Sequence, residues 1–219
     1  MKLSHLKQIA VYLQKLKNIS AIYRVADSVI KIAFDRDNDI YFDMQRSNSA
    51  IFKTHSFSRS KVYNAPFDVV LSRKFNRSNI LKVELLNDDK ILRFKTSLAS
   101  AYKEDIFYLQ FEFTGKYTNV IILDVNNIVL EALRHVDLLS SFREVKVGQR
   151  LLDVPHAPFH AKEYPVADIE EFLFDSYKKQ QSQKLDALKK QKIIYLEKKL
   201  EKLKKLYNSL EDEQVYMMN

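Results

Sequence analysis

The numbers of histidines, cysteines and glycines limit the kinds of metal site and catalytic motif that this chain can contain. There are five histidines, no cysteine and only two glycines. His156 and His160 are four residues apart, but Pro158 between them interrupts a helix face, and no acidic cluster at ligand spacing accompanies them. The sequence contains no Gly-x-Ser-x-Gly nucleophile elbow and no glycine-rich phosphate loop, and only two glycines are present to build either. We therefore expect no bound metal, no cofactor and no enzymatic activity.

A lysine-rich segment carries the charge of the chain. Residues 178–205 hold eleven lysines against three acidic residues, a net charge of +8 that equals the net charge of the whole chain. A surface helix ordinarily interleaves Glu and Lys, so this excess predicts contact with a polyanion. A solvated helix face is the alternative. The lysines that we expect to make such contacts are Lys184, Lys189, Lys190, Lys192, Lys198, Lys199 and Lys202.

The two glycines lie among strong strand formers. Gly115 and Gly148 each predict a turn whose backbone a side chain would strain. Asn119 is expected to form a turn rather than to bind a ligand, and Asn126-Asn127 predicts a tight hairpin. Arg143 is either a structural ion-pair partner or a functional residue, and the sequence leaves both readings open.

Residues 1–162 predict an α+β domain of mostly antiparallel strands with two helices. Ser4 can cap a first amphipathic helix over residues 4–17. Pro66 begins a second helix, with Asp68 in its first turn and Arg73 and Lys74 near its end, where they could pair with carboxylates. Alternating apolar residues predict strands at 29–35, 40–45, 50–54, 80–86, 91–95, 106–113, 119–124 and 128–134.

We expect residues 163–219 to form a long basic helix, because residues 167–213 contain neither Pro nor Gly to interrupt it. Leu196, Leu200, Leu203, Tyr207 and Leu210 step by the alternating fours and threes of a coiled-coil seam. A single helix cannot bury such a stripe, so it needs a returning helix or a second copy of the chain.

The compartment is expected to be the cytoplasm. The lack of cysteine suits a reducing environment. No apolar run approaches the roughly 18 residues of a membrane span. The N-terminal residues lack the apolar block of a signal peptide.

Three stretches resemble the N-terminal domain of the NFACT family. They are Gly-Lys-Tyr-Thr-Asn-Val-Ile-Ile-Leu-Asp (115–124), Ser-Phe-Arg-Glu-Val-Lys-Val-Gly-Gln (141–149) and the helix at 65–75. Val147 stands where the family usually has Pro. The fold of this domain is related to that of formamidopyrimidine-DNA glycosylases, whose nucleophile is an N-terminal Pro beside a Glu. Met1-Lys2-Leu3 offers neither residue, so glycosylase chemistry is not expected.

The resemblance implies a role in ribosome-associated quality control. Such a factor binds the large (50S) subunit carrying stalled peptidyl-tRNA and helps to recruit tRNA for C-terminal alanine tailing. The family's tRNA-recruiting Asp-Arg pair corresponds to Asp89-Lys90, joined by Arg73 and Lys74, and the lysine-rich helix would lie on rRNA. Lys90 keeps the charge of the family's Arg but loses its planar fork. From residue chemistry alone, Asp89-Lys90 is an ordinary polar hairpin tip.

Two other functions remain open. Many family members are described as fibronectin-binding proteins, so the chain could be a surface adhesin for fibronectin or fibrinogen. It could also be a coiled-coil module that forms a homodimer. The family's helix-hairpin-helix, second coiled-coil arm and C-terminal domain are not recognisable, so we expect a fragment of a longer protein.

Overall fold

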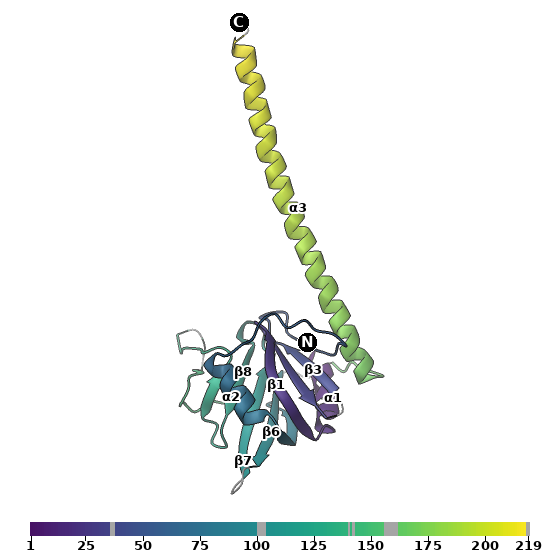
Figure 1. Ribbon diagram of the computed structural model, residues 1–219, viewed down its shortest axis with the longest axis vertical. Coiled ribbons are helices and arrows are strands. Elements are labelled where there is room, and N and C mark those ends of the chain that lie inside the picture. The colour runs from purple at the N-terminus through teal and green to yellow at the C-terminus, as the bar shows by residue number, and fades with distance from the viewer. Residues whose placement is uncertain (36–37, 100–103, 140, 142, 156–161, 218–219) are drawn as a thin grey trace. The chain divides into compact units, whose positions relative to one another are not determined.

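The structure is a computed structural model that describes residues 1–219 except 36–37, 100–103, 140, 142, 156–161 and 218–219. It divides into two units, Met1–Tyr177 and Lys178–Asn219. In its described residues, the first unit contains nine strands and two α-helices, and a third α-helix begins in it. Figure 1 shows these elements. This confirms the predicted α+β class. The domain boundary expected at 162/163 stays a prediction.

The strands form one antiparallel sheet in the order β4-β3-β2-β1-β5-β6-β7-β8-β9. Their bounds are β1 Asn18–Ala26, β2 Val29–Phe34, β3 Asn38–Asp43, β4 Ala50–Phe52, β5 Ser78–Leu85, β6 Ile91–Ala99, β7 Glu104–Glu112, β8 Asn119–Leu123 and β9 Val129–Ala132. Every strand predicted from alternation is present. The sequence reading missed β1 entirely.

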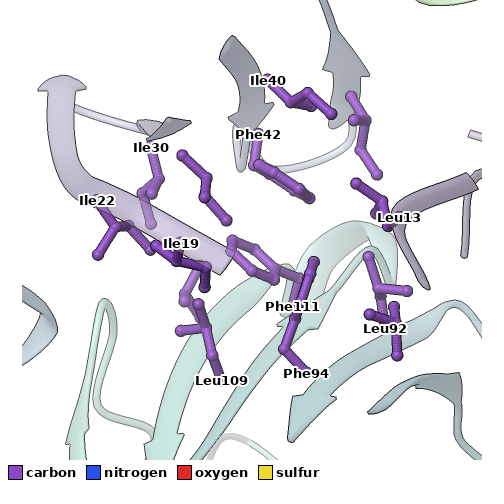
Figure 2. Close-up of a cluster of buried hydrophobic side chains, with 14 of the residues drawn as sticks. Leu13, Ile19, Ile22, Ile30, Ile40, Phe42, Leu92, Phe94, Leu109 and Phe111 are labelled. Atoms are coloured by element: carbon purple, nitrogen blue, oxygen red, sulfur yellow. The ribbon is translucent and has the colours of Figure 1, made fainter. Parts of the chain in front are cut away.

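The sheet folds back on itself, so that its two halves enclose the core. β1 and β5 join the halves through only two residue pairs, Asn18 with Asn79 and Ile19 with Ser78. Four strands separate β3 from β7 in the sheet, yet the rings of Phe42 and Phe111 stack with centroids 4.3 Å apart. Apolar side chains from both halves and from the first helix converge there (Figure 2). The core therefore lies between the two halves.

Two helices complete this core. α1 (Leu3–Gln14) buries Leu6, Ile9 and Leu13. The expected cap is wrong: Lys2 occupies the N-cap position, and Ser4 lies inside the helix, where its side chain does not cap it. α2 (Pro66–Phe75) begins at the predicted proline.

The first turn of α2 is fixed by its aspartate. Asp68 Oδ2 accepts the backbone N–H of Ala65 at 3.0 Å, and its carboxylate receives two hydrogen bonds from the Arg24 guanidinium of β1. A carboxylate in this position satisfies an otherwise unpaired donor and suits the helix dipole. The same side chain thus starts the helix and attaches it to the sheet.

α3 (Ile169–Met217) belongs to both units. Leu173 is fully buried in the core of the first unit, and its carbonyl accepts the Lys53 N–H at 3.1 Å. In the second unit the apolar residues of the predicted seam are exposed, with Leu196, Leu200 and Leu203 each at least half accessible. The side chain of Leu210 lies outside the described part of the chain.

Candidate nucleic-acid interface

Residues 86–90 form the turn between β5 and β6 that carries Asp89 and Lys90. Asn87 and Asp88 both have positive φ, 53° and 50°. This backbone is the one that a two-residue hairpin turn needs, and Asn and Asp tolerate it. The Asp89 N–H donates a hydrogen bond to the Leu86 carbonyl at 3.0 Å and closes the turn. The predicted hairpin is confirmed.

Side-chain contacts hold this turn in place. Asn87 Nδ2 donates to the Val154 carbonyl at 2.6 Å, and Asp89 Oδ1 accepts the Lys90 N–H at 2.6 Å. Lys7 of α1 forms an exposed ion pair with Asp88 at 3.2 Å. Within the described chain, the Lys90 ammonium has no ion-pair partner. The turn therefore presents a cation on a fixed backbone.

A buried polar network lies beside the turn. Arg93 donates twice to Gln110 Oε1, at 2.9 and 2.6 Å, and Gln110 Nε2 donates to Glu112 at 2.5 Å. Arg143 completes it with an ion pair to Glu112 and a hydrogen bond to the Leu152 carbonyl. All four side chains are buried. Arg143 thus forms an ion pair, as one of the two readings of the sequence predicts.

Sequence reasoning missed the other three members of the network. The sequence holds part of their signal, because Gln110 and Glu112 are two residues apart on one strand face. The pairing of Arg93 with Gln110 depends on the strand register. Burial lowers the pKa of the Arg93 guanidinium, and the nearby Asp153 carboxylate acts in the opposite direction. Polar residues on the buried face of a strand identify such a network only when the register of the neighbouring strands is known.

Arg73 and Lys74 lie apart from Asp89 and Lys90. They are in the last turn of α2, with the Lys74 ammonium 4.2 Å from the centre of the Phe107 ring. Phe107 pairs with Thr96, whereas Lys90 directly precedes Ile91. Six extended residues, 91–96, span roughly 20 Å. The structure therefore places the four expected tRNA contacts in two separate groups.

The lysines of the second unit are exposed along α3. The expected polyanion contacts, Lys184, Lys189, Lys190, Lys192, Lys198, Lys199 and Lys202, all have exposed side chains. At about 100° per residue, Lys198, Lys202 and Lys205 lie on the side of the helix opposite Leu196, Leu200 and Leu203. Lys205 pairs with Glu201 at 3.1 Å. Between residues 196 and 205 the helix thus has an apolar stripe and, opposite it, a row of lysines.

The two glycines and Asn119 contribute to backbone conformation and hydrogen bonding. Gly115 and Gly148 have φ of +64° and +82°, and an added Cβ would meet no atom within 4 Å at either position. The backbone conformation, rather than lack of space, is therefore what favours glycine. Asn119 begins β8, and its side chain exchanges hydrogen bonds with the backbone of Arg134 at 2.7 and 3.0 Å. It joins two segments and is not itself in the turn.

Metal and membrane features are limited to what the structure describes. His156 and His160 lie outside the described residues. In the described ranges, no three histidine or acidic side chains gather as metal ligands. No helix in the described part of the chain has both the length and the apolar character needed to span a bilayer.

Comparison with solved structures supports the fold. The N-terminal part of the fibronectin/fibrinogen-binding protein from Streptococcus suis is 21% identical, with a TM-score of 0.63 over 72% of this chain and 62% of that one. The N-terminal domain of fibronectin-binding protein PavA from Streptococcus pneumoniae is 18% identical, with a TM-score of 0.62 over 84% of this chain and 85% of that one.

A third structure, the fibrinogen-binding protein from Staphylococcus aureus, is 15% identical, with a TM-score of 0.53 over 72% of this chain and 58% of that one. The chain thus spans less than two thirds of the length of the S. suis and S. aureus chains. No curated protein matches it. The family described as NFACT N-terminal and middle domains matches residues 12–175. This match covers most of the chain and the whole sheet, and the chain therefore belongs to the NFACT family.

Proposed function

We propose that the chain is a non-enzymatic RNA-binding factor of ribosome-associated quality control. It binds the large (50S) subunit carrying stalled peptidyl-tRNA and helps to recruit tRNA for C-terminal alanine tailing. The observation that carries this proposal is the excess of eleven lysines over three acidic residues in residues 178–205. Family membership supports the choice of RNA over other polyanions.

In this proposal the α3 lysines and the turn at residues 86–90 make different contributions to RNA binding. The α3 lysines supply the sequence-independent attraction to phosphate that dominates nucleic-acid affinity. The turn at residues 86–90 supplies a positioned contact, because its backbone is held by Asn87 and Asp89. A fixed backbone reduces the ordering cost of binding a tRNA phosphate at Lys90.

The proposal is tested by the salt dependence of RNA binding. The full chain is compared with Lys198→Gln/Lys202→Gln/Lys205→Gln for binding to tRNA and to 50S subunits across a salt series. Each lost phosphate contact makes the negative slope of log K against log salt shallower by about 0.9, so the slope of the triple variant is expected to be shallower by up to roughly 3. The affinity of the triple variant for RNA at low salt is also expected to fall.

The matched control removes the same charge from the first unit. Lys61, Lys82 and Lys146 are exposed there, and their replacement by Gln is expected to change the slope little. Equal effects of the two triple variants would show that the attraction follows net charge and not α3. Failure of the unmodified chain to bind either RNA at low salt would refute the proposal.

A surface adhesin is the second candidate, because the similar structures are described as fibronectin- and fibrinogen-binding proteins. This function predicts binding to immobilised fibronectin or fibrinogen. The same two lysine variants discriminate between the candidates. Matrix-protein binding that survives both variants, together with no affinity for RNA, would favour the adhesin.

A further inference from the structure

A cavity of about 300 Å³ opens beside the segment that contains Gly115. Its lining includes Arg46, which follows β3, Lys116 of η1 (Gly115–Tyr117), and Arg134 and His135, which follow β9. Three segments that are distant in sequence therefore bring four basic side chains to one hollow. The volume lies at the lower end of small-molecule sites.

Arg134 forms the fixed part of this cavity. Its guanidinium donates to the Thr118 carbonyl at 2.9 Å and to the Met44 carbonyl at 3.0 Å. Within the described ranges, no carboxylate hydrogen-bonds this guanidinium. Burial lowers the pKa of Arg134, and the charge of Arg46 lowers it further, while Asp43 acts in the opposite direction. Two neutral carbonyl groups thus hold the guanidinium in place.

Two nearby carboxylates, those of Glu131 and Asp43, are hydrogen-bonded to other groups. Glu131 Oε1 contacts His135 Nε2 at 2.7 Å and accepts the Ala132 N–H at 2.9 Å. Asp43 Oδ1 accepts hydrogen bonds from Ser28 and from the Gln45 N–H. Neither Glu131 nor Asp43 is among the described residues that line the cavity. The positive charge of its lining therefore comes from Arg46, Lys116 and Arg134, because the His135 ring is paired with Glu131.

We propose that this cavity binds a terminal phosphate group. Arginine and lysine donors match the oxygens of a phosphate, and charge-assisted hydrogen bonds of this kind are among the strongest in proteins. Arg46 and Lys116 are exposed, so they can close on the anion from the solvent side, while Arg134 meets it from within. The group belongs either to a free small molecule or to the end of a nucleic acid.

The cavity lies at the same end of the sheet as the turn at residues 86–90. Glu112, the last residue of β7, pairs with Ile91 of β6 and with Asn119 of β8. Two strand spacings are about 10 Å. A nucleic-acid end in the cavity would thus approach the turn, although the phosphate site does not require the proposed function.

The test is calorimetric titration of the full chain at low salt. The ligands are inorganic pyrophosphate, a 5′-phosphorylated trinucleotide and the same trinucleotide without its 5′-phosphate. The variant Arg46→Ala/Lys116→Ala is expected to weaken binding of the phosphorylated ligands by about tenfold or more. Both positions are exposed, so the fold is retained. The matched control, Arg59→Ala/Lys61→Ala, removes the same charge at exposed positions outside the cavity lining and is expected to bind like the unmodified chain.

The ligands distinguish the source of the phosphate. Binding of pyrophosphate supports a free phosphate, and binding of the phosphorylated trinucleotide alone supports a nucleic-acid end. Pyrophosphate binding by a chain that has no affinity for tRNA or 50S subunits keeps this site while refuting the proposed function. The inference is overturned if neither phosphorylated ligand binds, if the 5′-phosphate makes no difference and pyrophosphate fails to bind, or if both double variants weaken binding equally.

Discussion

The contribution of Asp89 and Lys90 can be separated from the general charge of their turn. If this pair contacts tRNA, Asp89→Ala/Lys90→Ala removes the fixed cation and the side chain that positions its backbone. We expect tRNA to be lost from the purified protein, with a decrease in affinity of about tenfold for a charge-assisted contact. The measurement is tRNA recovery and binding.

An exposed ion pair outside the turn offers a matched control for this pair. Lys61 and Asp27 also form one cation and one carboxylate, 3.1 Å apart and exposed. The Lys61→Ala/Asp27→Ala variant therefore removes equal charge without altering the turn and should keep tRNA. Unchanged recovery in the Asp89/Lys90 variant would count against the assignment of this turn.

Tyr12 links residue chemistry to stability at high pH. Burial raises the pKa of its hydroxyl to about 12, and so does its 2.6 Å hydrogen bond to Glu170. In the unfolded chain a tyrosine ionises near pH 10. The neutral hydroxyl is therefore favoured by folding, and its contribution is complete below about pH 10 and is lost as the pH rises toward about 12.

The prediction for Tyr12 follows from this sign. Between about pH 10 and 12, the free energy of unfolding should fall less steeply for Tyr12→Phe than for the unmodified chain. Urea titrations at a series of pH values measure both slopes. The other eleven tyrosines are common to the two proteins, so the difference isolates Tyr12. Identical slopes would mean that Tyr12 ionises as in the unfolded chain.

At the scale of elements, the strand that sequence reasoning missed shows what alternation requires. β1 buries Ile19, Ile22 and Val25, which are three residues apart. Irregularities in its pairing with β2 fall between Ile19 and Ala21 and between Arg24 and Ala26. Each shifts the side chains relative to the two-residue period of a regular strand. Regular strands such as β6 were predictable, whereas this one depends on bulges that only tertiary pairing defines.

The candidate site was predictable to a similar degree. The turns at Gly115, Gly148 and Asn127 can be predicted from residue type alone, and all three residues have positive φ. The network around Glu112 and the cavity around Arg134 join segments far apart in the sequence, so spacing alone could not assemble them. Local backbone needs were thus visible in the sequence, but long-range polar contacts were not.

The first turns of α3 should be part of the stable core. Leu173 is fully buried, while Leu196 on the same helix is half exposed. Leu173→Ala leaves a cavity and should lower the free energy of unfolding of the first unit by about 2–5 kcal/mol. Leu196→Ala is the control and should cost less than about 1 kcal/mol. Chemical denaturation measures both, and equal costs would mean that the start of α3 does not stabilise the sheet.

At the scale of the whole molecule, the described helix of the second unit carries an exposed apolar stripe. Leu196, Leu200 and Leu203 follow the spacing of a coiled-coil seam and are exposed in the described helix. We expect the 219-residue chain to associate through them, because burying such a stripe in a partner helix removes apolar area from water. Sedimentation velocity over a range of protein concentrations measures the association.

Opposite sides of the same helix make this prediction specific. Leu196→Gln/Leu200→Gln/Leu203→Gln should abolish concentration-dependent association and leave the salt slope of RNA binding unchanged. Lys198→Gln/Lys202→Gln/Lys205→Gln should make the salt slope of RNA binding shallower and leave association unchanged, because these lysines lie away from the stripe. Association that survives the leucine variant would place the contact elsewhere, and loss of RNA binding in both variants would mean that RNA binds only the associated form.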